Sequence, residues 1–326
     1  MPTKWGLTRL RLRIAQAAPI LRAGGDFCYG LSNYGVYDTG DAHLKAAKKP
    51  RTPRPKEGLS STMTEPSRSV RNPSFRRPPL EEVVFGIRFE PLGNFRIPFF
   101  GLLWQKFRSE YPRVEHATPL TTGTTLAVDT ASGAPLPRVW FVNESDDELV
   151  QFQVDLLYYN WRRREKEYPR YPTIFPKFEE ARNSLESLLV ELAQDPIVIV
   201  EHELTYINHI PQGQGWDTLA DLPKVLPIFC ATSESLKFLP HPVNLAWSAR
   251  FDFPNTTGHL DVSLTQGTRR TDKHPVLLLQ LSAKGKATSA TWESSRAWFD
   301  TAHEWIVNGF ADLTAPEMQR QYWERE

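Results

Sequence analysis

The side chains best suited to chemistry lie close together in one short stretch, residues 201–209, which holds two histidines and two glutamates. Such groups ligate metal ions or exchange protons with a substrate. The stretch alternates like a β-strand, so His202 and His209, an odd number of residues apart, point to opposite faces. Glu201 and His209 share a face but lie about 26 Å apart at roughly 3.3 Å per residue. The spacing argues against a metal site, and the sequence predicts neither a metal nor a cofactor.

Acid–base catalysis is an alternative use of the same strand. Glu203 and His209 share one of its faces, and Asp155 lies on the polar face of another expected strand, so these three residues are the candidates for an enzyme of unrecognised class. The chain contains neither a G-x-S-x-G nucleophile elbow nor a glycine-rich phosphate-binding motif. No particular reaction is indicated, and the sequence favours a protein without catalytic activity.

A second unusual stretch, residues 156–172, reads LLYYNWRRREKEYPRYP. Its arginines could hold a phosphate or a carboxylate through paired hydrogen bonds, and its aromatic rings could stack on bases or anchor a partner. The structural alternative is that the rings close the core where a strand meets a loop. Together with polar residues of the other expected strands, the candidate binding residues are Arg88, Asn160, Trp161, Arg162, Tyr168, Arg170, Tyr206 and Asn208.

The charge distribution weakens the case for nucleic acid. Residues 1–62 carry 11 Lys or Arg against 4 Asp or Glu, whereas residues 63–326 carry 28 against 34. A mildly acidic body lacks the many phosphate contacts on which sequence-independent binding depends. Nucleic-acid binding through residues 158–171 therefore stays a less favoured alternative to an unidentified protein or small-molecule partner.

Hydrophobic periodicity predicts the elements that must position these residues. Strands are expected over residues 82–90, 138–143, 148–160, 198–210, 243–253, 258–268 and 276–284, and helices over residues 97–110, 174–193, 219–229 and 291–313. Each half of the chain follows a strand, helix, hairpin and helix order. The sequence thus predicts an α+β fold of pseudo-duplicated units, with an antiparallel sheet and helices packed on one face.

The predicted division of the chain has three parts. Residues 1–74 form a disordered extension or a mis-assigned start with translation beginning at Met63, residues 75–196 form a first α+β unit, and residues 197–326 form a second. In both units the strand face away from the helices is polar. A polar face of this kind is solvated, or it is a ligand or partner surface.

The cysteines and the hydropathy bear on the compartment. Cys28 and Cys230 cannot build a disulfide framework, and Cys230 is expected to be a buried, small apolar residue. No apolar run reaches the roughly 18 residues that a membrane-spanning helix needs. The sequence predicts a cytoplasmic protein without a membrane segment.

Several strings together resemble a family of sporadically distributed, uncharacterised bacterial proteins. They are RPPLEEVVFGIRF at 77–89, PRVWF at 137–141, NWR at 160–162, YPRY at 168–171, TYINHI at 205–210 and HEWIV at 303–307. The resemblance covers residues 77–326 and supplies no catalytic residues. A sporadic distribution implies an accessory role in a defence or toxin–antitoxin-like system. The resulting expectation is a non-enzymatic module that binds a protein or a ligand.

Overall fold

The computed structural model describes residues 72–120, 127–230, 238–254, 257–269 and 271–326, which form one antiparallel sheet of nine strands flanked by helices. The strand order is β2-β3-β4-β5-β1-β6-β9-β8-β7. The strands are β1 (Leu80–Phe89), β2 (Arg113–Ala117), β3 (Arg138–Val142), β4 (Glu148–Gln153), β5 (Leu156–Arg162), β6 (Ile199–Pro211), β7 (Ala246–Asp252), β8 (Gly258–Thr268) and β9 (Pro275–Gly285).

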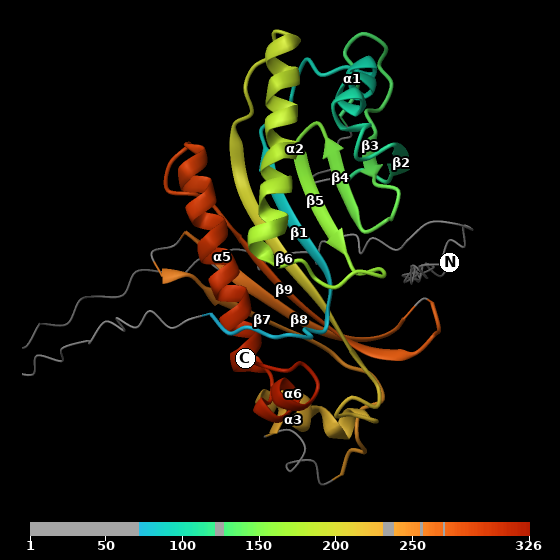
Figure 1. Ribbon diagram of the computed structural model, residues 1–326, viewed down its shortest axis with the longest axis vertical. Coiled ribbons are helices and arrows are strands. Elements are labelled where there is room, and N and C mark those ends of the chain that lie inside the picture. The colour runs from blue at the N-terminus through green and yellow to red at the C-terminus, as the bar shows by residue number, and fades with distance from the viewer. Residues whose placement is uncertain (1–71, 121–126, 231–237, 255–256, 270) are drawn as a thin grey trace, which may run out of the picture. The chain divides into compact units, whose positions relative to one another are not determined.

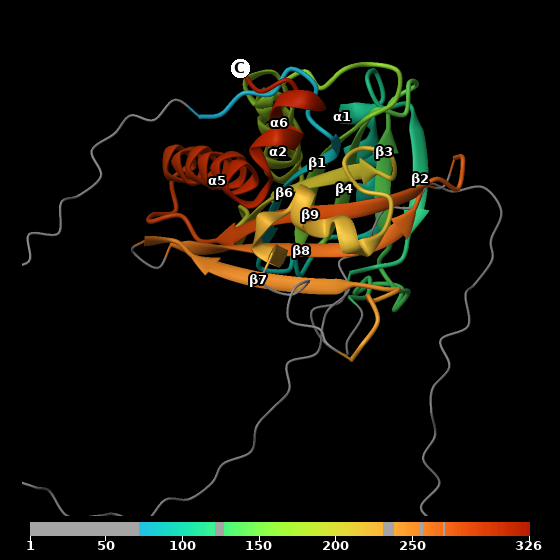
Figure 2. The ribbon, with the colours of Figure 1, turned by 90° about the horizontal axis from the view of Figure 1, so that it is seen from below.

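Three helices cover one face of this sheet (Figures 1 and 2): α1 (Ile97–Phe107), α2 (Tyr171–Glu191) and α5 (Trp292–Leu313). Shorter helical turns lie at one end of the sheet, namely η1 (Leu219–Asp221), α3 (Leu222–Val225), η2 (Pro227–Phe229) and α6 (Pro316–Gln321). The α+β class, the antiparallel sheet and the packing of the long helices on one face confirm the prediction from the sequence.

The central strand β1 shows how the sequence specifies this arrangement. Its alternate residues Val83, Phe85, Ile87 and Phe89 are buried on the helix side. The Phe85 ring stacks on Phe178 of α2 at 5.8 Å between centroids, and it also contacts α5. A period of two therefore brings every second side chain of the strand into one core with both long helices.

The strands on the two sides of the central β1–β6 pair follow the same kind of order, in which the strand number falls toward each edge. From β1 outward the sheet continues through β5, β4, β3 and β2, and from β6 outward it continues through β9, β8 and β7. The two predicted units, 75–196 and 197–326, share this one sheet because β1 pairs with β6. The internal duplication itself stays a prediction, and the predicted extension 1–74 lies almost wholly outside the described residues.

Three details predicted from the sequence are wrong. The strand expected over 148–160 is two strands, because the chain turns at Val154 and Asp155, and Gln153 then pairs with Leu156. The helix expected over 219–229 is broken into three short turns, since Pro223 and Pro227 lack the N–H groups that a continuous helix needs. Cys230 is exposed rather than buried, because it follows the last of these turns.

Two elements escaped the sequence analysis, the edge strand β2 and the short helix α6. β2 has a largely exposed pattern with two of its five residues half-buried, so it carries little apolar alternation. Among the described helices, none has both the length and the apolar character required to cross a bilayer.

Candidate functional site

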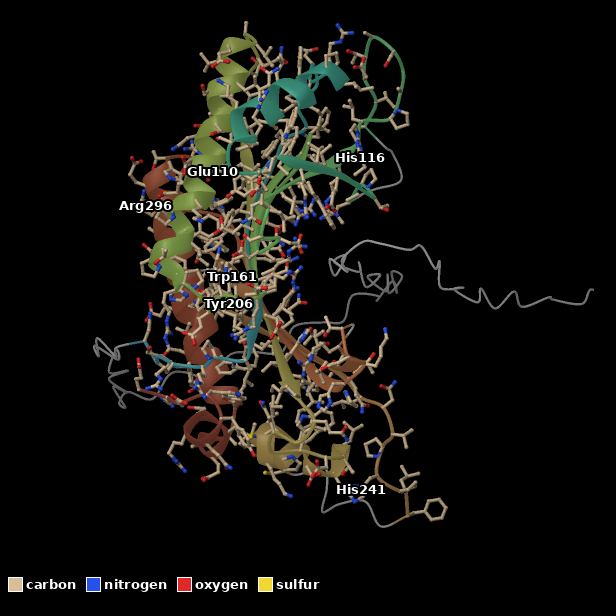
Figure 3. The ribbon with its side chains drawn as sticks, turned by 45° about the vertical axis from the view of Figure 1, so that its right-hand side comes forward. Glu110, His116, Trp161, Tyr206, His241 and Arg296 are labelled. Atoms are coloured by element: carbon tan, nitrogen blue, oxygen red, sulfur yellow. The ribbon has the colours of Figure 1, made fainter. Side chains whose placement is uncertain are left out.

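The helix side of the sheet brings together five of the eight candidate binding residues. Val83 of β1 pairs with Trp161 of β5 on one side and with Tyr206 of β6 on the other, so both side chains lie on the same face. Figure 3 labels both residues near the middle of the sheet. Tyr168 lies against both, at 5.1 Å from the Trp161 ring and 6.3 Å from the Tyr206 ring.

A chain of hydrogen bonds connects this aromatic group to α5. The hydroxyls of Tyr168 and Tyr206 are 2.9 Å apart, and the Tyr206 hydroxyl lies 3.0 Å from Nδ1 of His303. The Tyr171 ring stacks on His303 at 4.2 Å with an interplanar angle of 9°, and its hydroxyl donates to Asp300 at 2.9 Å. Residues of β6 and α2 therefore meet His303 of α5.

Burial determines which of these hydrogen-bonded side chains carry a proton. It lowers the pKa of His303 to about 4, so the imidazole is neutral at pH 7. Burial also raises the pKa of Tyr168 and Tyr206, and both hydroxyls stay protonated. When the Tyr206 hydroxyl donates to Nδ1, the remaining proton of the neutral imidazole is on Nε2. Within the described residues, this Nε2 has no hydrogen-bond partner.

These residues line a cavity of about 420 Å³. Its walls come from residues 72–78, from the start of α2, from β6, from α5 and from the last residue of the chain. Aromatic and aliphatic side chains dominate the lining, among them Phe75, Leu80, Tyr171, Ile306 and Phe310. Asn208 adds a side-chain amide; its Nδ2 donates to the Leu279 carbonyl at 3.2 Å.

Arg170 is the cationic residue of this lining and has an unusual backbone. Its φ of 78° and ψ of 153° belong to a region that non-glycine residues rarely adopt. The residue precedes Tyr171 and Pro172, with which α2 begins. Its Nη1 donates to the Phe75 carbonyl at 2.9 Å and so ties residues 72–78 to the start of α2. Strained residues of this kind are common at functional sites.

The segment before β1 closes one side of the cavity. Ser74 and Phe75 pair with the end of the chain, through a 2.9 Å bond from the Glu326 N–H to the Ser74 carbonyl and a β-bridge between Phe75 and Arg325. The Ser74 hydroxyl also donates to the exposed Glu326 carboxylate at 2.9 Å. The two ends of the described chain thus form a continuous wall of the cavity.

The other three candidates, Arg88, Asn160 and Arg162, lie on the opposite face of the sheet. The eight residues therefore do not form one surface, because neighbours on a strand point to opposite sides. Asn160 is buried and belongs to a hydrogen-bonded row across four strands. It accepts from Gln151 Nε2 at 2.6 Å and donates to Glu82 Oε1 at 2.5 Å, and Arg138 donates to Gln151.

The polar face is not solvated at its centre. Glu82 and Asn160 are buried, and burial raises the pKa of Glu82. Arg162 donates to Asp146 at 2.8 Å, and Arg88 lies 3.9 Å from Glu201. Because these polar groups bond to one another across neighbouring strands, their first role is to fix the register of the sheet.

The predicted enzyme residues are not brought together. Glu203 is buried among Tyr158, Thr205 and Ser282, and the Tyr158 hydroxyl donates to it at 2.9 Å. His209 lies six residues further along β6, about 20 Å away at strand spacing. Asp155 is in the turn between β4 and β5 and contributes a backbone carbonyl to Phe89. The described residues contain no cluster of three or more His, Cys, Asp or Glu that could hold a metal ion.

The arginines of the 158–171 segment have partners inside the protein. Arg164 and Arg162 both donate to Asp146, while Arg163 donates to the carbonyls of Leu80 and Pro78. The Arg163 bonds hold the loop after β5 against the start of β1, and the bonds to Asp146 hold it against the turn between β3 and β4. They leave less positive charge for a phosphate backbone than the sequence of the segment suggests.

His303 is a site residue that the sequence analysis did not identify. The pair His303-Glu304 reads as a packed helical pair among tryptophans. The sequence nevertheless indicated that the His303 side chain faces the core. Phe299, Ile306 and Phe310 lie at helical intervals from it, on one face of α5. A polar residue in an apolar helical stripe points into the core. No protein-family model, curated protein or solved structure matches this chain.

Proposed function

We propose that this protein is a non-enzymatic module that binds a small, largely apolar molecule in the cavity beside His303. The observation that supports this proposal most strongly is the cavity itself, of about 420 Å³, where Tyr168, Arg170, Tyr206 and Asn208 meet. Ligand cavities in proteins typically measure about 300–1,000 Å³ and combine apolar walls with a few polar groups. In this protein, residues far apart in the sequence supply both the apolar walls and the polar groups of the cavity.

Unused polar groups in the lining favour a ligand over a purely structural role. Within the described part of the chain, Asn208 Oδ1 and His303 Nε2 have no hydrogen-bond partner, although their residues line the cavity. Neither atom is fully buried, so both can reach a hydrogen-bonding group of a molecule in the cavity. A ligand with one donor and one acceptor would satisfy both atoms.

The test uses a neutral fluorescent probe and a variant that fills the cavity. We expect N-phenyl-1-naphthylamine to bind saturably, with increased fluorescence, because its rings match the apolar walls. Val307→Trp places an indole in the lining and should abolish this binding. Val190→Trp is the matched control, since Val190 is 80% exposed on α2. Equal binding to both variants would show that the probe does not occupy the cavity.

The cellular setting is part of the same proposal. We place the protein in the cytoplasm because it has only two cysteines, which suits a reducing compartment. The resemblance to sporadically distributed bacterial proteins supports an accessory role in a defence or toxin–antitoxin-like system. Phage challenge of cells carrying the wild type or Val307→Trp tests this role, and equal survival would argue against it.

A further inference from the structure

We infer that the ligand of this cavity is a small monocarboxylate with an apolar body, and that Arg170 receives its carboxylate. The inference rests on the proposed ligand-binding function and names the chemistry of the ligand.

The Arg170 guanidinium is charged and has unused hydrogen-bond donors. It lines a mainly apolar cavity, and within the described residues no carboxylate lies within 4.0 Å of it to form an ion pair. Only one of its N–H groups is used, by Nη1 in the bond to the Phe75 carbonyl. A guanidinium stays charged and offers five donors in a planar fork, which suits the two oxygens of a carboxylate.

The cavity lining carries few charged side chains. Arg170 is the only Lys or Arg among the described residues that line the cavity, and the exposed Glu326 carboxylate lies at the same lining. A dianion such as a phosphate monoester would face one cation and one anion. Because the lining offers one cation, it can pair with one negative charge on a ligand, and the Glu326 carboxylate would repel a second.

The apolar side chains of the lining indicate the body of the ligand. Phe75, Tyr171 and Phe310 supply aromatic surface, and Ile306 and Val307 supply aliphatic surface. Burial of an apolar body against these side chains gains about 25 cal/mol per Å² of area removed from water. A molecule with an aromatic or aliphatic body and one carboxylate combines this gain with the pairing at Arg170.

The experiment compares 1-naphthaleneacetate with 1-naphthaleneacetamide, which has nearly the same shape but no charge. We measure displacement of N-phenyl-1-naphthylamine from the full-length protein by each compound. The acid should bind about tenfold or more tightly than the amide, as one charge-assisted pair allows. Arg170→Gln keeps a donor for the Phe75 carbonyl but removes the charge, so the affinity for the acid should fall to that for the amide and the preference should disappear. Arg170→Lys should retain part of the preference, and it serves as the second variant if Arg170→Gln fails to fold.

The outcomes separate the inference from the proposed function. Equal binding of acid and amide to the wild type, or displacement by neither, would overturn the inference while probe binding lost in Val307→Trp still supports the cavity. An acid preference that persists in Arg170→Gln would also overturn it. Failure of the probe to bind the wild type would overturn the proposed function and the inference with it.

Discussion

Gly86 of β1 lies directly beneath the ring of Tyr158 of β5, so that a Cβ added at Gly86 would come within 2.2 Å of Tyr158 Cε1. The two residues are cross-strand partners, and Gly86 also pairs with Glu203 of β6. The ring therefore passes over β1, and its hydroxyl donates to Glu203 at 2.9 Å. The absence of a side chain at Gly86 lets one buried hydrogen bond connect strands on both sides of β1.

Gly86→Ala should lower the free energy of unfolding by about 2–3 kcal/mol, because the methyl group must displace the Tyr158 ring. Urea denaturation measures the loss. Gly93→Ala is the control, since an added Cβ there meets nothing within 4 Å. In a Tyr158→Ala background the cost of Gly86→Ala should fall below about 1 kcal/mol. Additive costs in the double variant would mean that the two residues are not coupled in this way.

Asn160→Leu should be strongly destabilising without changing ligand affinity. The substitution preserves size but removes the buried partner of Gln151 Nε2 and of Glu82 Oε1, which costs about 2–4 kcal/mol. Asn183→Leu, at an exposed position of α2, should change stability by less than about 0.5 kcal/mol. Thermal denaturation and probe titration of both variants check this. A large loss of probe affinity in folded Asn160→Leu would instead make Asn160 a binding residue.

The strand pattern could have separated the candidate residues before the structure was known. Asn160, Trp161 and Arg162 are consecutive in β5, so Trp161 must face away from the other two. The sequence did predict the strand that carries Tyr206, but the strand expected over 148–160 joined β4 to β5 and ended one residue before Trp161. It could not show that β5 and β6 flank β1, because those pairings join residues about 80 and 120 positions apart.

The cavity was harder to anticipate for the same reason. Tyr168, Arg170, Tyr206 and Asn208 were singled out individually, but their meeting point needs α5 and residues 72–78, which local periodicity does not place. The strain at Arg170 is equally invisible in the sequence, because arginine has no preference for a positive φ.

The stability of the protein should fall between pH 6.5 and pH 4, in part because of His202. Burial against Trp298 and Phe299 lowers its pKa from 6.5 to about 4, while its Nε2 lies 2.9 Å from the Ser295 hydroxyl. As the pH falls below 6.5, His202 takes up a proton in the unfolded chain but stays neutral in the folded protein. This contribution is fully present above pH 6.5 and declines by up to about 1.4 kcal/mol per pH unit until pH 4.

Urea denaturation of His202→Gln at several pH values tests this effect. Between pH 6.5 and pH 4, the slope of unfolding free energy against pH should be smaller than in the wild type. The difference should correspond to the uptake of about one proton, which is up to about 1.4 kcal/mol per pH unit. His241→Gln, at an exposed loop position, is the control and should keep the wild-type slope. An unchanged slope in His202→Gln would assign the pH dependence to other groups.

The backbone of Arg170 gives a prediction with an unusual sign. With a φ of 78° and a ψ of 153°, Arg170→Ala loses the bond to Phe75 and keeps the strain, whereas Arg170→Gly loses the same bond and relieves the strain. The glycine variant should therefore be the more stable of the two by about 1–2 kcal/mol. At Arg320 in α6 the order should reverse. Arg320→Ala should be more stable than Arg320→Gly, because glycine in a helix costs about 1 kcal/mol relative to alanine. Chemical denaturation of the four variants measures both differences. A glycine variant at 170 that is no more stable than the alanine variant would mean that the backbone there is not strained, and the conformation of Arg170 would then be no guide to a functional site.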